Sequence, residues 1–460
     1  MSERFYNLLQ KYDVPAPRYT SYPTVLAWTD KVGVKDYEAS LQNVGAGLPL
    51  LSLYFHLPFC ENLCHFCGCM QVITKDHSRS REYVDELLKE IDRVANLLPA
   101  KARRVSQIHF GGGTPNFLQP SELTEIVEKI RSHFTLLPDA EVAIEMHPRT
   151  STQEFCDNLK TLGFNRISLG VQDLDPKVQK LINRHQTFEM TRDMIKNLRS
   201  LDFSHFNIDL VYGLPGQTME GWTKTLEQII GLKPNRLAVY SYAHVPWARP
   251  VQRTFEDADL PNPTMKLKLF EKAYQTFTSN GYRHIGIDHF ALASDELCQA
   301  QDNGSIHRNF MGYSTRADAH QIGFGVSAIS YVGGNYFQNQ KNLKDYYEKI
   351  REGNLATFRG FLLKKDDSLR REIITQIMCR GKIEISSLEK KWGVIFKKYF
   401  ASELSWLQKF GDDNILEMSD HEIRAIGEGF LFLRNIAMVF DATLDEVRKR
   451  ASTPAFSRAV

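Results

Sequence analysis

Short apolar runs alternate with amphipathic stretches through the first half of the chain, and this alternation restricts the fold more than any other feature. The apolar or β-branched runs are 51–57, 105–110, 141–146, 166–171, 206–212 and 236–242. The stretches between them with a helical spacing of apolar residues are 80–97, 121–134, 152–162, 187–201 and 219–231. Such a pattern predicts an α/β fold with a parallel sheet and helices on one outer side. It is typical of both an open barrel and a doubly wound sheet.

The segments on either side of this region have different patterns. Residues 1–50 are polar, and three prolines in the segment PAPRYTSYPT (15–24) exclude a helix there. After about residue 355, helical patterns surround a predicted hairpin at 414–425; they are 366–380, 385–391, 396–409 and 427–440. We therefore expect an N-terminal arm (1–50), a β/α domain (51–355) and a mostly helical, winged-helix-like C-terminal domain (356–460).

The cysteines point to a metal or redox site. Four of the seven lie within ten residues, as Cys60, Cys64, Cys67 and Cys69. Zinc sites usually combine two separated pairs of ligands, and no second pair follows. Three thiolates in the spacing C-x3-C-x2-C suit a four-iron cubane, in which one iron stays open for another ligand. Cys69 is one residue removed from Cys67, so we interpret it as a neighbour of the site rather than a ligand. A zinc knuckle is the alternative.

Polar and glycine-rich motifs follow the predicted strands. In parallel β/α folds the chemistry gathers at the C-terminal ends of the strands. The motif Gly111–Pro115 lets backbone N–H groups approach a zwitterion or a phosphate. Glu145 is suited to an ammonium or to ribose hydroxyls, and Arg184 to a carboxylate. The alternative for Glu145 is a solvated carboxylate at the end of a strand.

Composition excludes several classes of protein. The chain has 460 residues and a formal net charge of +2, which gives no general attraction for nucleic acid or anionic membranes. No run of 18 apolar residues is present, so no membrane-spanning helix is predicted. The beginning of the sequence, MSERFYNLLQKYDVP, lacks the features of a secretory signal. We expect a cytoplasmic protein that binds neither nucleic acid nor membranes.

Several motifs together carry a resemblance to a known family. They are PRYTSYPT, YFHLPFCENLCHFCGC, GGGTP, GVQD, NRHQ, NIDLVYGLP, YAHVP, HRNFMGY and FSRAV. Over essentially its whole length, the chain resembles the oxygen-independent coproporphyrinogen III oxidases, which are radical S-adenosylmethionine (SAM) enzymes. The resemblance implies a partial (β/α)6 barrel with an N-terminal arm and a mostly helical C-terminal domain.

The resemblance also implies a reaction and its cofactors. One 4Fe-4S cluster, held by Cys60, Cys64 and Cys67, would bind SAM and cleave it to a 5′-deoxyadenosyl radical. The radical would drive anaerobic oxidative decarboxylation of two propionate side chains of coproporphyrinogen III, which gives protoporphyrinogen IX in haem biosynthesis. The implied partners are this substrate and a low-potential electron donor such as flavodoxin or ferredoxin. We expect a monomer.

Residue by residue, the resemblance implies two bound molecules of SAM. The contacts of the cluster-bound molecule would be Tyr54, Gly112, Glu145 and Ile329. Those of the second molecule would be Phe66, Gly113, Thr114, Gln172, Arg184, Asp209 and Ala243. The implied catalytic residues are the three cysteine ligands and Glu145. For the four carboxylates of the substrate we expect Arg18, Tyr19, Tyr22 and Arg308. The chain departs from the family pattern at His65, His147 and His185, which adjoin retained site residues.

Three other functions compete with this interpretation. A haem-binding chaperone relative would share the cluster, but such relatives show C-D-F after the third cysteine and lack the PRYTSYPT segment. A haem-degrading radical methyltransferase would have a different residue in place of Cys69. A zinc-stabilised winged-helix binding protein belongs to another class, and zinc without iron would identify it.

Overall fold

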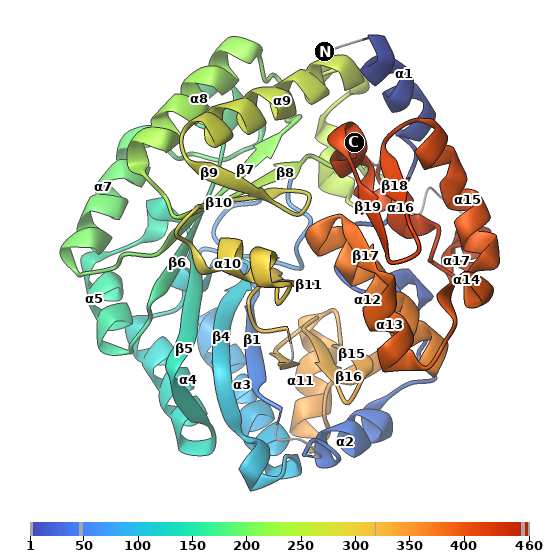
Figure 1. Ribbon diagram of the computed structural model, residues 1–460. Coiled ribbons are helices and arrows are strands. Elements are labelled where there is room, and N and C mark those ends of the chain that lie inside the picture. Colours follow the sequence, from blue (N-terminus) through green and yellow to red (C-terminus); the bar gives the residue numbers. More distant parts are fainter. Residues whose placement is uncertain (1–2, 46–48, 318, 452–455, 459–460) are drawn as a thin grey trace.

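A single large sheet organises most of the chain (Figure 1). The computed structural model describes residues 3–45, 49–317, 319–451 and 456–458. Within these residues, the sheet has 12 strands in the order β16-β15-β14-β13-β1-β4-β5-β6-β7-β8-β10-β9. Its first six strands in the chain are β1 (Leu51–Leu57), β4 (Arg104–Gly112), β5 (Thr135–Met146), β6 (Arg166–Gln172), β7 (Phe206–Tyr212) and β8 (Arg236–Ser241). These six confirm the predicted strands.

The topology decides between the two predicted architectures. The six strands are parallel, and they are adjacent in the order in which they occur in the chain. In a doubly wound sheet the strand order reverses at one point, and helices cover both faces. When each right-handed crossover leads to the next strand in the same direction, all helices lie on one face of the sheet. The sheet is therefore that of an open barrel, and the doubly wound alternative is wrong.

The crossover helices cover the outer side of the sheet (Figure 1). They are α3 (Arg79–Leu97), α4 (Pro120–His133), α5 (Gln153–Thr161), α6 (Pro176–Leu181), α7 (Phe188–Ser200) and α8 (Met219–Leu232). Five of them confirm predicted helices, and the short α6 was not predicted. The apolar residues of each strand face these helices; in β1 they are Leu51, Leu53 and Phe55, all fully buried. Alternate residues of the strands therefore point to the inner face of the sheet.

The sheet extends beyond the six predicted strands at both edges. One edge carries β10 (His289–Leu292) and β9 (Tyr282–Ile285), which follow α9 (Pro263–Ser279). The other edge carries β13 (His320–Phe324), β14 (Ile329–Val332), β15 (Asn335–Asn339) and β16 (Thr357–Leu362). Outside this sheet lie β2 (Phe59–Cys60), β3 (Val72–Ile73), α10 (Glu296–Asn303), β11 (His307–Asn309), β12 (Gly312–Ser314) and α11 (Leu343–Arg351). Because β16 belongs to the sheet, the sheet continues past residue 355.

The C-terminal residues form a second core. Their elements are α12 (Lys365–Arg380), β17 (Lys382–Glu384), α13 (Ile385–Trp392), α14 (Phe396–Tyr399), α15 (Ala401–Asp412), β18 (Leu416–Met418), β19 (Glu422–Ala425), α16 (Leu433–Met438) and α17 (Leu444–Arg450). The predicted hairpin is β18–β19, and β17 adds a third strand to it. Helices thus surround a small antiparallel sheet, and the region is mostly helical, as expected.

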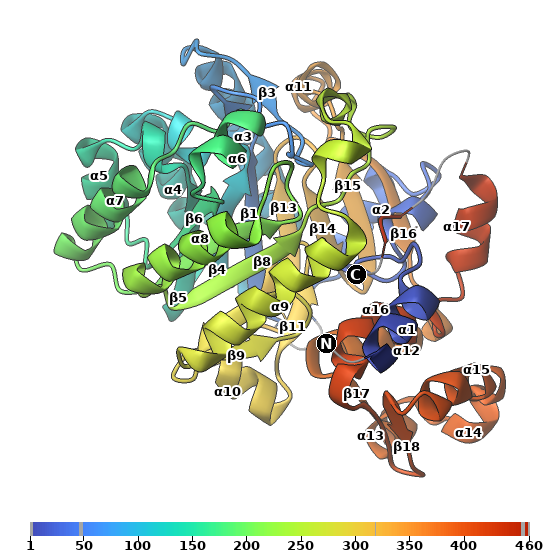
Figure 2. The same cartoon turned by 90° about the horizontal axis from the view of Figure 1, so that it is seen from above.

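The N-terminal arm contacts both cores (Figure 2). Its first helix, α1 (Glu3–Tyr12), supplies Leu8 and Tyr12 to the C-terminal core. Its second helix, α2 (Val34–Gln42), supplies Tyr37 and Leu41 to the core of the β/α part. The proline-rich segment between them is not helical up to Thr24, as predicted. Among the described residues, no helix is long and apolar enough to cross a membrane.

Candidate functional site

The cysteine loop connects β2 to β3 at the C-terminal end of the first strand. Cys60 ends β2, while Cys64, Cys67 and Cys69 lie on the loop, and all four thiols are free. The first three are half-buried and Cys69 is exposed. The backbone N–H of Thr74 donates to the carbonyl of Cys60 at 2.9 Å, which joins the two ends of the loop. The loop is thus held at its base, and its four cysteines line one cavity.

Polar groups already surround the three predicted ligands. The Cys60 Sγ lies 3.2 Å from the Thr114 Oγ1, and the Arg184 guanidinium donates to the Cys64 Sγ at 3.8 Å. The Cys67 Sγ accepts from the backbone N–H of Cys69 at 3.5 Å. Burial raises the pKa of Cys60 to about 12, whereas contact with Cys69 lowers the pKa of Cys67 to about 7. Two of the predicted SAM contacts therefore reach the predicted cluster ligands directly.

Most of the predicted site residues line one cavity at the strand ends. Those that line it are Cys60, Cys64, Cys67, Phe66, Gly112, Gly113, Thr114, Glu145, Gln172, Arg184 and Asp209. Cys69, His147 and His185 line it as well. The structure thus brings together residues that are up to about 150 positions apart in the chain, from Cys60 to Asp209.

Three predicted contacts lie beside this cavity rather than in its wall. Tyr54 stacks against His109, with 6.0 Å between the ring centroids, and it pairs with Gly323 of β13. A Cβ at Gly323 would lie 2.5 Å from the carbonyl oxygen of Ile329, so Ile329 packs against that strand. Ala243 lines a neighbouring cavity, between α9 and α1.

The glycine triplet permits a close approach of backbones. Gly112 has φ +110°, and a Cβ there would lie 2.6 Å from the His56 ring. A Cβ at Gly113 would lie 2.6 Å from the carbonyl carbon of Pro58, while the Gly113 N–H donates to Leu57 at 2.8 Å. Any side chain at these two positions would therefore push the cavity wall away from the cysteine loop.

Glu145 is oriented by a histidine that sequence reasoning did not assign. The His109 Nε2 lies 2.9 Å from the Glu145 Oε1, and the Gly112 N–H donates to Oε2 at 3.4 Å. Burial alone would raise the pKa of Glu145, but the hydrogen bond and charge of His109 lower it on balance. About 40% of the side chain remains exposed to the cavity. Glu145 is therefore an ionised acceptor. Side chains alternate between the two faces along β4, and this alternation turns His109 to the inner face beside Tyr54. That position is the signal in the sequence that could have identified His109 as a site residue.

The residues that follow β6 and β7 complete the wall. Gln172 has φ +71° where the pairing of β6 with β7 shifts register, which turns its side chain toward Gly170. Arg184 donates to the Gly170 carbonyl and, at 3.0 Å, to the Gln186 Oε1. Asp209 accepts from the Asn207 amide at 2.7 Å. A carboxyl and a guanidinium therefore line the same cavity.

The departures from the family pattern keep the cavity polar. Burial lowers the pKa of His147 to about 2, and the charges of Arg184 and Arg149 act in the same direction. His147 is thus neutral near pH 7, and its Nδ1 accepts from the Arg149 N–H at 3.2 Å. The His65 Nδ1 lies 3.1 Å from the carbonyl oxygen of Leu181.

The residues expected to bind substrate carboxylates are engaged by protein groups. Arg18 donates to the Ser241 carbonyl at 2.7 Å, and Arg308 pairs with Asp288 at 3.2 Å. The Tyr19 hydroxyl donates to Asp441 at 3.0 Å, and the Tyr22 hydroxyl accepts from the backbone of Ala442 at 3.1 Å. Tyr19 and Tyr22 belong to the C-terminal core, where they join the arm to that domain.

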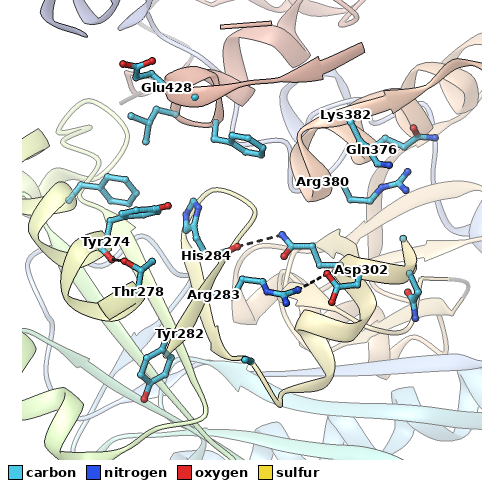
Figure 3. A pocket seen from close by; sticks show the side chains of 18 of the residues that line it. Tyr274, Thr278, Tyr282, Arg283, His284, Asp302, Gln376, Arg380, Lys382 and Glu428 are labelled. Atoms are coloured by element: carbon cyan, nitrogen blue, oxygen red, sulfur yellow. Dashed lines mark hydrogen bonds and ion pairs between the residues drawn. The ribbon is translucent and has the colours of Figure 1, made fainter. Parts of the chain in front are cut away.

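A wider cavity separates the edge strand β9 from the C-terminal domain (Figure 3). Tyr274 and His284 project from one wall, and Arg380 and Lys382 from the other. The Nε2 of His284 is buried without a hydrogen-bond partner among the described residues. Of the described residues that line this cavity, none is a predicted site residue.

Known proteins share this arrangement. Residues 54–229 match the model of the radical SAM superfamily. The chain is 42% identical, over 98% of each chain, to the oxygen-independent coproporphyrinogen III oxidase of Salmonella typhimurium. It is 41% identical to that of Pseudomonas aeruginosa, over 99% of this chain and 98% of the relative. The chain belongs to the oxygen-independent coproporphyrinogen III oxidase family. It is therefore an oxidoreductase.

A solved structure of this family has the same fold. The coproporphyrinogen III oxidase (HemN) from Escherichia coli, a radical SAM enzyme, superposes with a TM-score of 0.90 at 40% identity. The match covers 95% of this chain and 98% of the other. The predicted radical SAM barrel is confirmed.

The residues present fit the cofactors that the radical SAM family implies. Three free thiols in one polar cavity are soft donors of the kind that a 4Fe-4S cluster takes. Among the described residues, no three His, Cys, Asp or Glu side chains converge as ligands of a single metal ion. A cubane takes each thiolate on a different iron, so its ligands surround a cluster rather than one ion. An ionised Glu145 in the wall of the same cavity suits the ammonium of SAM.

The assignment of Cys69 is testable. Cys69→Ser is expected to retain the full iron and acid-labile sulfide content, because Cys69 is exposed and serine keeps both the N–H and a side-chain donor that face Cys67. Metal analysis and the visible absorbance spectrum of the reconstituted protein provide the measurement. Cys298→Ser, remote from the loop, is the matched control. Loss of iron from the Cys69 variant alone would mean that the ligand set is wrong.

Asp209 is expected to make stability depend on pH. Burial raises its pKa to about 7, and the nearby Glu145 carboxylate adds to the shift. An unfolded Asp has a pKa near ~4, so between ~4 and ~7 the folded chain holds a proton that the unfolded chain has released. The free energy of unfolding therefore falls as the pH rises through this window. Denaturant unfolding of the cluster-free protein at several pH values should show this decrease in the free energy of unfolding, and Asp209→Asn should remove it.

The control for this measurement is Asp257→Asn, because the Asp257 side chain is 99% exposed. It is expected to leave the pH profile of the free energy of unfolding as it is. If the Asp209→Asn profile keeps the same slope as the unaltered protein between pH 5 and about 7, the shifted pKa belongs to another group.

Proposed function

We propose that this protein converts coproporphyrinogen III to protoporphyrinogen IX by oxidative decarboxylation of two propionate side chains, without oxygen. The observation that carries the proposal is full-length identity of 42% to enzymes named oxygen-independent coproporphyrinogen III oxidase. The cysteine loop and the motif-bearing strand ends, which line one cavity, support it. The step belongs to haem biosynthesis.

Cys60, Cys64 and Cys67 would hold the 4Fe-4S cluster, and Glu145 would receive the ammonium or ribose hydroxyls of SAM. When bound, the cluster and SAM supply an electron and a 5′-deoxyadenosyl radical that takes hydrogen from the propionate β-carbon, after which CO2 and one electron leave and a vinyl group remains. His109 keeps the Glu145 carboxylate ionised and aimed into the cavity.

The proposal includes a second molecule of SAM. Its contacts would be Phe66, Gly113, Thr114, Gln172, Arg184, Asp209 and Ala243. Support comes from Arg184 and Asp209, which offer a cation and a carboxyl to a zwitterionic ligand. Phe66 packs against the apolar cluster that contains Tyr242 and Phe255, so its ring is held at the edge of the cavity.

Further parts of the proposal concern partners, organisation and location. A low-potential electron donor such as flavodoxin or ferredoxin would reduce the cluster, and the enzyme would act as a monomer. The arm (1–50), the β/α domain (51–355) and the C-terminal domain (356–460) remain the proposed units, with β16 at the start of the last unit completing the sheet of the second. A cytoplasmic location is supported by seven free cysteines, which a reducing compartment preserves.

An anaerobic assay tests the reaction. The iron-reconstituted protein is mixed with SAM, a reductant and coproporphyrinogen III, and oxidised porphyrins are separated by chromatography together with 5′-deoxyadenosine. Protoporphyrin is the expected product. Deoxyadenosine without protoporphyrin would leave the radical chemistry standing but exclude this substrate.

A further inference from the structure

Three cations from separate segments gather near the cysteine loop. Arg249 lies in the long connection after β8, Lys341 follows β15, and Arg359 lies on β16. Lys341 and Arg359 contact the same ring, since their charged groups lie 5.7 Å and 5.2 Å from the centroid of Phe358. We call Arg249, Lys341 and Arg359 the rim cations.

One of the rim cations, Arg249, is held on the cysteine loop beside the active-site cavity. Arg249 donates to the carbonyl of Gly68, which lies between the cavity-lining Cys67 and Cys69. Gln252, three residues further on, donates to the Phe66 carbonyl at 3.4 Å and holds the same segment on the loop. This connection therefore forms a wall of the opening above the cysteine loop.

Arg359 approaches the same space from the sheet. Its Nε donates to the Gln338 Oε1 at 2.8 Å, and Gln338 is paired with both Arg359 and Ile329 across neighbouring strands. Paired residues point to the same face of a sheet. Phe337, one residue earlier, packs into the core beneath the helices, so Gln338, Arg359 and Ile329 face inward. Arg359 thus shares the inner face with the predicted SAM contact Ile329.

The rim cations have no negative partner in the part of the chain that the structure describes. Their contacts there are a carbonyl, an amide and an aromatic ring. Burial lowers the pKa of Lys341, and the charges of Arg359 and Arg249 lower it further, so the three groups lie close enough to repel one another. Like charges held together destabilise the folded chain unless an anion joins them. The arrangement is therefore complementary to a ligand with more than one negative group.

We propose that Arg249, Lys341 and Arg359 bind propionate carboxylates of the tetrapyrrole substrate and hold the macrocycle over the cavity. The inference rests on the proposed function, because it takes its ligand from that reaction. Arg359 points to the inner face of the sheet, where a carboxylate on a flexible propionate can reach. A docked electron-donor protein would instead contact the outer surface, so the observations favour the small ligand.

Equilibrium binding separates this inference from the reaction itself. The probe is coproporphyrin III, the oxidised form of the substrate with the same four propionates, titrated by its fluorescence into the protein without SAM or reductant. Each lost charge-assisted contact is expected to weaken binding about tenfold, so Lys341→Gln with Arg359→Gln should raise Kd about a hundredfold. The tetramethyl ester of the probe, which lacks the charges, should bind the variant and the unaltered protein alike. Lys224→Gln with Lys268→Gln, at exposed positions on α8 and α9, is the control of equal charge change.

Kinetics give a second readout. In the anaerobic assay the double variant should raise KM for coproporphyrinogen III more than it lowers kcat, with iron content equal to that of the unaltered protein. The inference would be overturned if the double variant had the same Kd for coproporphyrin III and the same KM for coproporphyrinogen III as the unaltered protein. The inference would also be overturned if the double variant were less active with an electron-donor protein but fully active with a chemical reductant. That result would assign the three cations to docking of the electron donor. If the unaltered protein makes no protoporphyrin but binds coproporphyrin through these residues, the proposed reaction fails and the subsite stands.

Discussion

We expect Cys64→Ala to lack the 4Fe-4S cluster, both as purified and after reconstitution with iron and sulfide. Cys60, Cys64 and Cys67 are the three proposed ligands, and two of them cannot replace the third because each binds a different iron. The brown absorbance, the acid-labile sulfide and the formation of 5′-deoxyadenosine are all expected to be lost. Iron and sulfide analysis of the purified variant gives the measurement.

The control is Cys156→Ala, because Cys156 is buried beneath the sheet on α5 and lies outside the loop. This substitution also removes one thiol, and the variant should retain the iron content of the unaltered protein. A Cys64 variant with full iron and sulfide content would show that the cluster is held elsewhere. Circular dichroism of both variants distinguishes loss of the cluster from loss of the fold.

Glu145→Gln is expected to lower the affinity for SAM about 10- to 100-fold, since a hydrogen bond to a charged group contributes about 1.5–3 kcal/mol. The amide keeps the shape of the side chain beside His109 but removes the negative charge that faces the cavity. Equilibrium binding of SAM to the reconstituted protein measures the effect, and the rate of 5′-deoxyadenosine formation should fall with it.

Glu154→Gln serves as the control, because Glu154 is exposed in the first turn of α5. The iron content of both variants should equal that of the unaltered protein. SAM affinity of the Glu145 variant within about twofold of the unaltered protein would assign the carboxylate to the structure of the strand rather than to the ligand.

The six parallel strands were predictable because each carries its own signal. In LSLYFHL the apolar side chains pack beneath helices, while Ser52, Tyr54 and His56 point to the inner face of the sheet. The local sequence is therefore enough to predict this buried strand, without knowledge of the strands that pair with it. The edge strands β13 to β16 gave no such signal, because their positions follow from pairing with segments far away in the chain. β13 pairs with β1 over more than 260 residues, a contact that no local pattern encodes.

The site was predictable where chemistry is concentrated in short motifs. Cys60, Gly113 and Glu145 each belong to such a motif, and they line one cavity. His109 was missed because a single histidine in a strand is more often a core residue, and only its contact with Glu145 assigns it a role. The rim cations lie in unrelated segments, so tertiary structure alone brings them together.

The contribution of α1 to the C-terminal core has a consequence for biosynthesis. Leu8 and Tyr12 pack against residues such as Phe432 and Ile436, and the backbone of Ala16 donates to Ser457 at 3.0 Å. Residues of α1 thus remain without these partners until residues more than 400 positions later have been made. The β/α region can fold while synthesis continues, since its core is drawn from residues up to about 356. The contacts of α1 and Ala16 can form only after the segment from Phe432 to Ser457 has been synthesised.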